Sequence, residues 1–284
     1  MKVHQVSVST GLTKQSEEPL VMALGMFDGV HLAHMELLET AKSVAQRLGL
    51  KLGVMTFFPH PRAVIVGHGQ MQYLTPLKRK LTRFATAGVD EAFVVQFERS
   101  FAELSPYEFV SRFLLGHIQH AVVGFDFRYG HKGLGSVATL KEQGKGFFDV
   151  TVVEEMKSLG CKISSTQIRK WIAAGVVELV PHHLGRRYEV TGTVEMVTSE
   201  RRVLIALDDE YLLPPSGDYE FDLLFANDVR MEGMLGCLTN DGYIVGETPI
   251  EIDFLARGES LVVVWNKQRW TQLEQTRLEH SAVN

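Results

Sequence analysis

The chain has 284 residues, 45% of them hydrophobic and 22% charged, with a formal net charge of -5. A mildly acidic protein has no long-range attraction to nucleic acid or to an anionic membrane, so neither partner is expected. No segment has the apolar length of a membrane span, and the N-terminus lacks a signal-peptide core. The two cysteines, Cys161 and Cys237, have no metal-ligand or redox spacing. We therefore expect a cytoplasmic globular protein of two domains.

Short apolar runs alternate with helical patterns in the first two thirds of the chain. Strands are predicted at "VMALGMF", "KLGVMTFF", "EAFVVQF", "HAVVGF" and "FFDVTVVEE", and helices over 37–48, at "PLKRKLTRFATAG" and at "SPYEFVSRFLL". Ser105, Pro106 and Glu108 give the last of these helices a capping-box signature. Such alternation predicts a doubly wound, Rossmann-like α/β domain, with a parallel sheet and helices on both faces.

The pattern changes after "VPHHLGRR". From "RRYEVTGTVEMV" onward, short alternating runs are separated by turn signals such as "PPSGD" and "NDG". This is typical of an all-β domain, a sandwich or a small barrel. We place the domains at 1–184 and 185–284, and expect a short helix in the tail "KQRWTQLEQTRLEHSAVN".

The stretch "GMFDGVHLAH", residues 25–34, lies where a predicted strand passes into a helix. Ligands of open parallel sheets bind at this edge, beside helix N-termini. Gly25 and Gly29 allow a sharp turn and close approach of a ligand, and His31 and His34 would present two hydrogen-bond donors on one side of the first turn. The pattern therefore indicates a polyphosphate site without a Walker loop or a GxGxxG motif. Two ordinary surface histidines are the alternative.

This stretch resembles the "GxFDGVHxGH" signature of the nucleotidyltransferase superfamily. More specifically, it is similar to the FAD synthetase module of prokaryotic bifunctional riboflavin kinase/FAD synthetases. Three further stretches match that family in order: "TFFPHP" (56–61), "VVGFDFRYG" (122–130) and "KISSTQIR" (162–169). The resemblance covers essentially the whole first domain.

The resemblance implies transfer of AMP from ATP to FMN, giving FAD and pyrophosphate. Positioning and charge neutralisation can supply most of the barrier reduction for such an in-line attack. His31, His34 and Arg169 are the implied catalytic residues. The implied ATP-binding set is Gly25, Phe27, Asp28, Gly29, His31, His34, Ser164, Ser165, Thr166 and Arg169. Mg²⁺ is expected, held chiefly by ligand oxygens and water, and no protein ligand to the metal is identified.

For FMN, the resemblance implies a site formed by His60, Pro61, Asp126, Phe127 and Tyr129. Aromatic residues at strand ends belong to the hydrophobic core more often than to a ligand site. His60 and Asp126 are therefore favoured over the aromatic residues as ligand contacts.

The sequence departs from the family at several positions. In the first domain, Ala33 replaces a glycine, Met26 an asparagine and Ser136 an acidic residue. In the second, "LGRRYEVTGTV" matches the start of a riboflavin kinase barrel, but the "GxPTAN" element that binds Mg²⁺ and ATP is absent. Glu251 is the only candidate remnant of the kinase's general base.

We therefore expect an FAD synthetase without kinase activity, joined to a degenerate barrel and supplied with FMN by a separate riboflavin kinase. Three alternatives stay open. The protein could retain weak kinase activity, act as a non-catalytic flavin or nucleotide regulator, or transfer a nucleotidyl group to another phosphate acceptor.

Overall fold

The computed structural model describes residues 1–12, 18–66, 71–198, 202–226, 229–247 and 256–269. The chain folds into two compact units, Met1–Ile163 and Ser164–Asn284. No helix in the described ranges is long and apolar enough to cross a membrane. The predicted limit of the catalytic domain at residue 184 stays a prediction.

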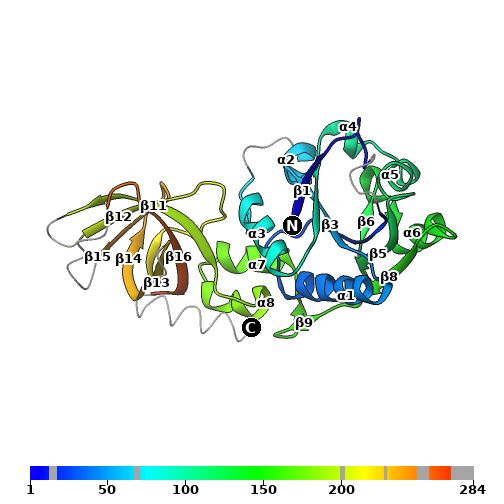
Figure 1. The fold of residues 1–284 in the computed structure, drawn as a ribbon. Coiled ribbons are helices and arrows are strands. Elements are labelled where there is room, and N and C mark those ends of the chain that lie inside the picture. Colours follow the sequence, from blue (N-terminus) through cyan, green and yellow to red (C-terminus); the bar gives the residue numbers. More distant parts are fainter. Residues whose placement is uncertain (13–17, 67–70, 199–201, 227–228, 248–255, 270–284) are drawn as a thin grey trace. The chain divides into compact units, whose positions relative to one another are not determined.

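A six-stranded parallel sheet forms the centre of the first unit (Figure 1). Its strand order is β1-β4-β3-β2-β5-β8. The strands are β1 (Lys2–Val6), β2 (Leu20–Leu24), β3 (Leu52–Phe58), β4 (Glu91–Gln96), β5 (Ile118–Gly124) and β8 (Asp149–Val153). The strand order reverses its direction between β2 and β5, which creates a crevice at their carboxyl ends. The predicted Rossmann-like architecture is confirmed, whereas edge strand β1 was not predicted.

Helices cover both faces of this sheet because β2 sends alternate side chains to opposite sides. Val21 and Ala23 pack with residues of α1 (Leu32–Leu48) and α3 (Leu77–Thr86). Leu20, Met22 and Leu24 pack instead with residues of α4 (Arg99–Ala102), α5 (Pro106–Phe113) and α6 (Val137–Gly144). The sheet therefore separates two hydrophobic cores.

Shorter elements complete the first unit: α2 (Pro61–Val66), β6 (Arg128–Tyr129), η1 (His131–Gly133), β7 (Gly135–Ser136), β9 (Lys157–Ser158) and β10 (Cys161–Lys162). The predicted capping box of α5 is present. Ser105 Oγ accepts from the Glu108 N–H at 3.2 Å, and the Glu108 carboxylate accepts from the Ser105 N–H at 2.9 Å. These reciprocal bonds explain why the helix begins at Pro106.

The second unit begins with α7 (Ser165–Ala173), η2 (Val177–Leu179) and α8 (Pro181–Leu184) and continues as a closed barrel (Figure 1). The barrel order is β11 (Glu189–Val197), β12 (Arg202–Leu207), β15 (Tyr243–Glu247), β14 (Arg230–Leu238), β13 (Gly217–Phe225) and β16 (Ser260–Gln268). Of the two predicted all-β forms, the barrel is therefore the one adopted. The predicted C-terminal helix and Glu251 lie outside the described residues.

A buried carboxylate links three strands of the barrel and the residues before β11. Asp222 is 2% exposed. Its oxygens accept from Arg187 at 2.9 Å, Arg230 at 2.6 Å, Asn266 at 2.8 Å and the Gly233 N–H at 3.0 Å. Burial alone would raise the pKa of Asp222, but these donors outweigh it and lower that pKa to about 2.

Replacing Asp222 with asparagine is expected to destabilise the barrel by about 2 kcal/mol at pH 7. Since the folded-state pKa is depressed, this stabilisation is complete above the unfolded-state value and is lost as the pH falls toward about 2. Urea unfolding of Asp222→Asn and of the exposed control Asp209→Asn, each at pH 7 and pH 4, measures the difference. Equal midpoints for the two variants at pH 7 would contradict the role of the carboxylate.

Candidate active site at the carboxyl edge of the parallel sheet

The loop after β2 has an unusual backbone at the switch point of the sheet. Phe27, Gly29 and Val30 have φ values of 54°, 86° and 44°. Positive φ is unfavourable for Phe and Val, and such conformations cluster at functional sites. The Phe27 ring lies so close to Gly25 that a Cβ there would be 3.1 Å from it. These constraints leave the loop few alternative conformations, and they fix the direction in which the chain enters α1.

His31 is the N-cap of α1, and its ring performs the capping. Its Nδ1 accepts from the His34 N–H at 3.3 Å, and the residue is 5% exposed. A nitrogen that accepts a hydrogen bond carries no proton, so the neutral ring has its proton on Nε2. The fold thus selects the tautomer of His31 that donates from Nε2.

His34 stacks on His31, with ring centroids 3.6 Å apart and planes 10° apart. Burial, the neighbouring His31 and the charge of Lys80 hold the pKa of His34 well below its ordinary value. His34 Nδ1 is buried and has no hydrogen-bond partner among the described residues. A neutral His34 ring protonated on Nε2 avoids burying an unpaired N–H, so this tautomer donates from Nε2, as the neutral tautomer of His31 does.

Asp28 fixes the neighbouring loop. It is 2% exposed, and its Oδ1 accepts from the N–H groups of Leu74 at 3.0 Å and Thr75 at 3.3 Å. Those residues lie just before α3, so one carboxylate ties the two loops together. No cluster of three or more metal-ligating side chains occurs in the described part of the chain.

An apolar pocket of about 320 Å³ adjoins this loop in the first unit. Of the predicted flavin-site residues, Pro61, Phe127 and Tyr129 line it, and Gly25 and Met26 line it too. The rest of the lining, which sequence reasoning missed, is Phe57, Ile65, Phe97, Phe101, Ala102, Leu104, Phe109, Arg128, Gly130, Lys132 and Gly133. Gly25 and Met26 also begin the loop that leads to His31. The same loop therefore runs from the wall of the pocket to the histidine pair.

The two favoured flavin contacts, His60 and Asp126, do not line the pocket. His60 Nδ1 accepts from the Arg62 N–H, and the His60 N–H donates to the Tyr73 hydroxyl, each at 3.1 Å. Asp126 is exposed and pairs with Lys162. The structure thus places the aromatic residues, rather than these two, in the pocket wall, and a role for His60 and Asp126 in flavin binding stays a prediction.

The "SSTQIR" residues begin the second unit. Ser164 is the N-cap of α7, and its Oγ accepts from the Gln167 N–H at 3.3 Å. Ser165, Thr166 and Arg169 follow on the same helix. The capped helix is confirmed, and its predicted role in phosphate binding stays a prediction.

Lys80, which sequence reasoning missed, lies beneath the histidine loop. Its side chain is 1% exposed. Its Nζ donates to the Met26 carbonyl oxygen at 3.0 Å and to Thr56 Oγ1 at 3.4 Å, and Thr56 Oγ1 donates to the same carbonyl at 2.9 Å. Its position in the helical pattern could have indicated that it is buried, because Lys80 lies on the same face of α3 as Phe84.

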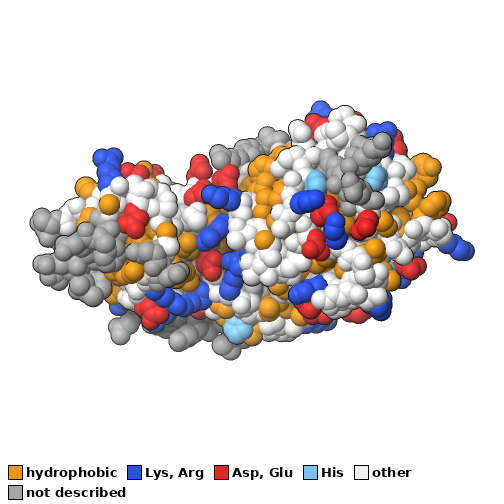
Figure 2. Space-filling view, in the orientation of Figure 1, with side chains coloured by type: hydrophobic (Ala, Val, Ile, Leu, Met, Phe, Trp, Pro, Cys, Tyr) orange, Lys and Arg blue, Asp and Glu red, His pale blue; other side chains and the backbone are white. Residues whose placement is uncertain are grey.

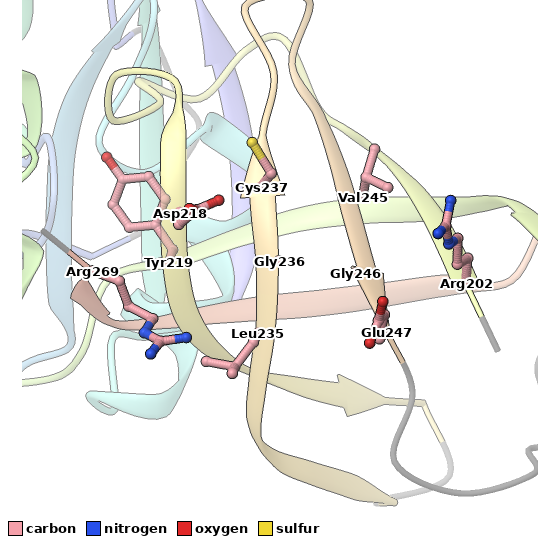
Figure 3. Close-up of a pocket in the computed structure, with 10 residues that line it drawn as sticks. All are labelled: Arg202, Asp218, Tyr219, Leu235, Gly236, Cys237, Val245, Gly246, Glu247 and Arg269. Carbon is pink, nitrogen blue, oxygen red and sulfur yellow. The ribbon is translucent and has the colours of Figure 1, made fainter. Parts of the chain in front are cut away.

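The barrel has a pocket of its own, of about 360 Å³, over strands β12 to β15 (Figure 3). Arg202 and Glu247 lie toward one end and Arg269 and Asp218 toward the other, with Gly236 and Gly246 between them. Among the described residues that line it there is neither threonine nor asparagine. On the molecular face in Figure 2, acidic and basic side chains are interspersed.

A parallel sheet with its switch point beside a capped helix, two stacked histidines and an adjoining pocket is the arrangement of a Rossmann-like ligand-binding domain. The sequence model of the FAD synthetase family matches residues 13–167. The chain belongs to the FAD synthetase family.

Curated relatives carry two names. A bifunctional riboflavin kinase/FMN adenylyltransferase of Listeria monocytogenes is 42% identical over 207 residues, covering 70% of this chain and 66% of the relative, just under two thirds. The protein of that name from Bacillus subtilis is 38% identical over 227 residues, covering 77% and 72%. An FAD synthetase of L. monocytogenes is 33% identical over 221 residues, covering 77% of this chain and 87% of the relative.

A crystal structure described as a macrolide-efflux protein from Streptococcus pneumoniae has a similar fold. It superposes with a TM-score of 0.83 and 22% identity, covering 99% of this chain and 97% of that one. At this identity the likeness concerns the fold alone.

Proposed function

We propose that the protein transfers AMP from ATP to FMN, producing FAD and pyrophosphate. One observation carries the proposal: the loop that begins with Gly25 and Met26, in the wall of an apolar pocket, leads directly to the two histidine donors. A pocket with aromatic walls suits a planar isoalloxazine ring. Nε2–H donors at a helix N-terminus suit the phosphates of ATP.

The chemistry is a displacement at the α-phosphorus of ATP. An FMN phosphate oxygen forms a bond to that phosphorus, the bond to the bridging oxygen breaks, and pyrophosphate leaves with the electron pair. Negative charge increases on the α-phosphate oxygens and on the leaving group, where His31 and His34 donate hydrogen bonds. Because both rings are held before substrate arrives, they stabilise this charge without reorganising.

Mg²⁺, when bound, would neutralise part of the phosphate charge. The side chains at the histidine corner fit a metal held by the nucleotide rather than by the protein, since Asp28 Oδ1 already accepts two backbone hydrogen bonds. Arg169 and the hydroxyls of Ser164, Ser165 and Thr166 are proposed as further contacts to ATP, on the strength of the family motif alone.

We also propose that the protein lacks riboflavin kinase activity and depends on a separate kinase for FMN, in the cytoplasm. The absent "PTAN" sequence supports this, as does a barrel pocket whose described lining residues include neither of the two side-chain types expected for Mg²⁺ and ATP. The relative named FAD synthetase, matched over 87% of its length, is consistent with it. The relatives named bifunctional keep the alternative of residual kinase activity open.

The purified protein is expected to form FAD from FMN, ATP and Mg²⁺, and to form neither FMN nor FAD from riboflavin. Chromatography of two parallel reactions, one with each flavin, measures both activities. FMN appearing from riboflavin would refute the absence of kinase activity. Failure to make FAD from FMN would refute the adenylyltransferase and favour a flavin or nucleotide regulator, which binding assays with each compound would then test.

A further inference from the structure

Lys80 is a buried ammonium group without a carboxylate partner at ion-pair distance in the part of the chain that the structure describes. Its two hydrogen-bond acceptors, the Met26 carbonyl and the Thr56 hydroxyl, are both neutral. Burying a charge in this way costs free energy that a methionine of similar volume would not cost. Burial accordingly lowers the pKa of Lys80 to about 8, against the opposing charge of Asp28. The charge of the buried Asp28 offsets part of this cost.

The hydrogen-bond acceptors of Lys80 show which part of the loop its side chain fixes. Met26 lines the apolar pocket, and its carbonyl oxygen receives hydrogen bonds from both Lys80 and Thr56. The same peptide group leads into Phe27, which has a positive φ of 54°. Two donors on one carbonyl therefore fix the orientation of the peptide at which the loop leaves the pocket.

The orientation of that peptide affects the histidines through the packing of Phe27. The Phe27 ring is fully buried and lies 5.1 Å from the His34 ring, which stacks on His31. Lys80 also acts on His34 by its charge. Burial lowers the pKa of His34 most, followed by the charge of His31 on the same helix and then by that of Lys80 from α3. A cation beneath the loop thus disfavours a cationic His34.

We propose that Lys80 is a positioning residue for AMP transfer: it fixes the loop between the apolar pocket and the histidine pair and places a positive charge near His34, without touching substrate. This inference rests on the proposed function. Loss of a contact made equally in the ground state and the transition state raises KM, whereas loss of alignment lowers kcat at nearly constant KM. Titration of the His34 ring gives a second readout, which loss of a substrate contact would not change.

Lys80→Met is the direct test, because methionine fills a similar volume without a charge. We expect kcat to fall about 10- to 100-fold, with KM for ATP and FMN changed less than about threefold. Lys78→Met, on the exposed side of the same helix, is the matched control and should behave like the unchanged protein. A kcat of Lys80→Met within twofold of the unchanged protein would overturn the proposal.

Thr56→Val covers the case in which Lys80→Met does not fold. It removes the other donor to the Met26 carbonyl and leaves the ammonium group in place. We expect kcat to fall with KM unchanged, and an unchanged kcat would count against the proposal.

A nuclear magnetic resonance titration of the histidine rings separates this proposal from the proposed function. The pKa of His34 should rise in Lys80→Met, and not in Lys78→Met, whether or not FAD is made. If the unchanged protein makes no FAD, the proposed function fails. An unshifted His34 titration in Lys80→Met would refute the electrostatic role of Lys80 independently of activity.

Discussion

Replacing His31 with serine is expected to lower kcat/KM for FAD formation by about 100- to 1,000-fold, the usual cost of losing a preorganised donor to transition-state charge. Serine is chosen because His31 is also the N-cap of α1. A serine hydroxyl caps helices well, so this change removes the ring while preserving the helix start. Steady-state kinetics with ATP and FMN, together with thermal unfolding, measure the two effects separately.

His117→Ala is the matched control for His31. His117 precedes β5 and so lies at the amino ends of the strands, opposite the proposed site. Its kinetic constants should match those of the unchanged protein. If His31→Ser keeps activity within about threefold, the histidine pair does not stabilise the transition state, and the phosphate-binding interpretation of the corner fails.

Filling the apolar pocket is expected to weaken FMN binding selectively. Ala102 lines the pocket at the end of α4, and tryptophan there would occupy much of its volume of about 320 Å³. We expect KM for FMN to rise about tenfold or more, since accommodating a flavin beside the added ring costs at least about 1.4 kcal/mol. The dissociation constant for ATP in the absence of FMN should not change, because the histidine corner is untouched.

Ala138→Trp provides the control for Ala102→Trp, because Ala138 lies in the first turn of α6 and does not line the pocket. Fluorescence titration of FMN and calorimetric titration of ATP measure the two dissociation constants. Equal FMN affinity in the two tryptophan variants would mean that the flavin binds elsewhere. Weakened ATP binding in Ala102→Trp alone would assign the pocket to adenosine.

The features that could be predicted from the sequence are those that depend on residues adjacent in the chain. Ser105 and Glu108 mark the start of α5 because a capping box involves only neighbouring residues. The apolar runs of β2 and β5 identify buried parallel strands. The histidine corner was predicted in the same way, since strand end, loop and helix start are contiguous in the chain.

The remainder depends on residues distant in sequence. Closure of the barrel requires β11 to pair with β16. No local sequence pattern distinguishes a chain that makes this pairing from one that forms a β-sandwich. Phe57 and Phe101 belong to one hydrophobic cluster and also line the pocket, and which of their neighbours leave that space open depends on segments distant in sequence. Lys80 was overlooked because a lysine in a helical pattern is usually solvated, and its acceptors come from two other segments.

Capping and ring stacking immobilise His31 and His34 during folding. Ordering a flexible side chain at an interface costs about 0.5–1.5 kcal/mol of conformational entropy when it happens on binding. Here that ordering is complete once the first turn of α1 has formed, so under the proposed function nucleotide binding involves little further loss of rotamer freedom in either ring. Local fraying of α1 is then expected to weaken nucleotide binding before the rest of the domain unfolds.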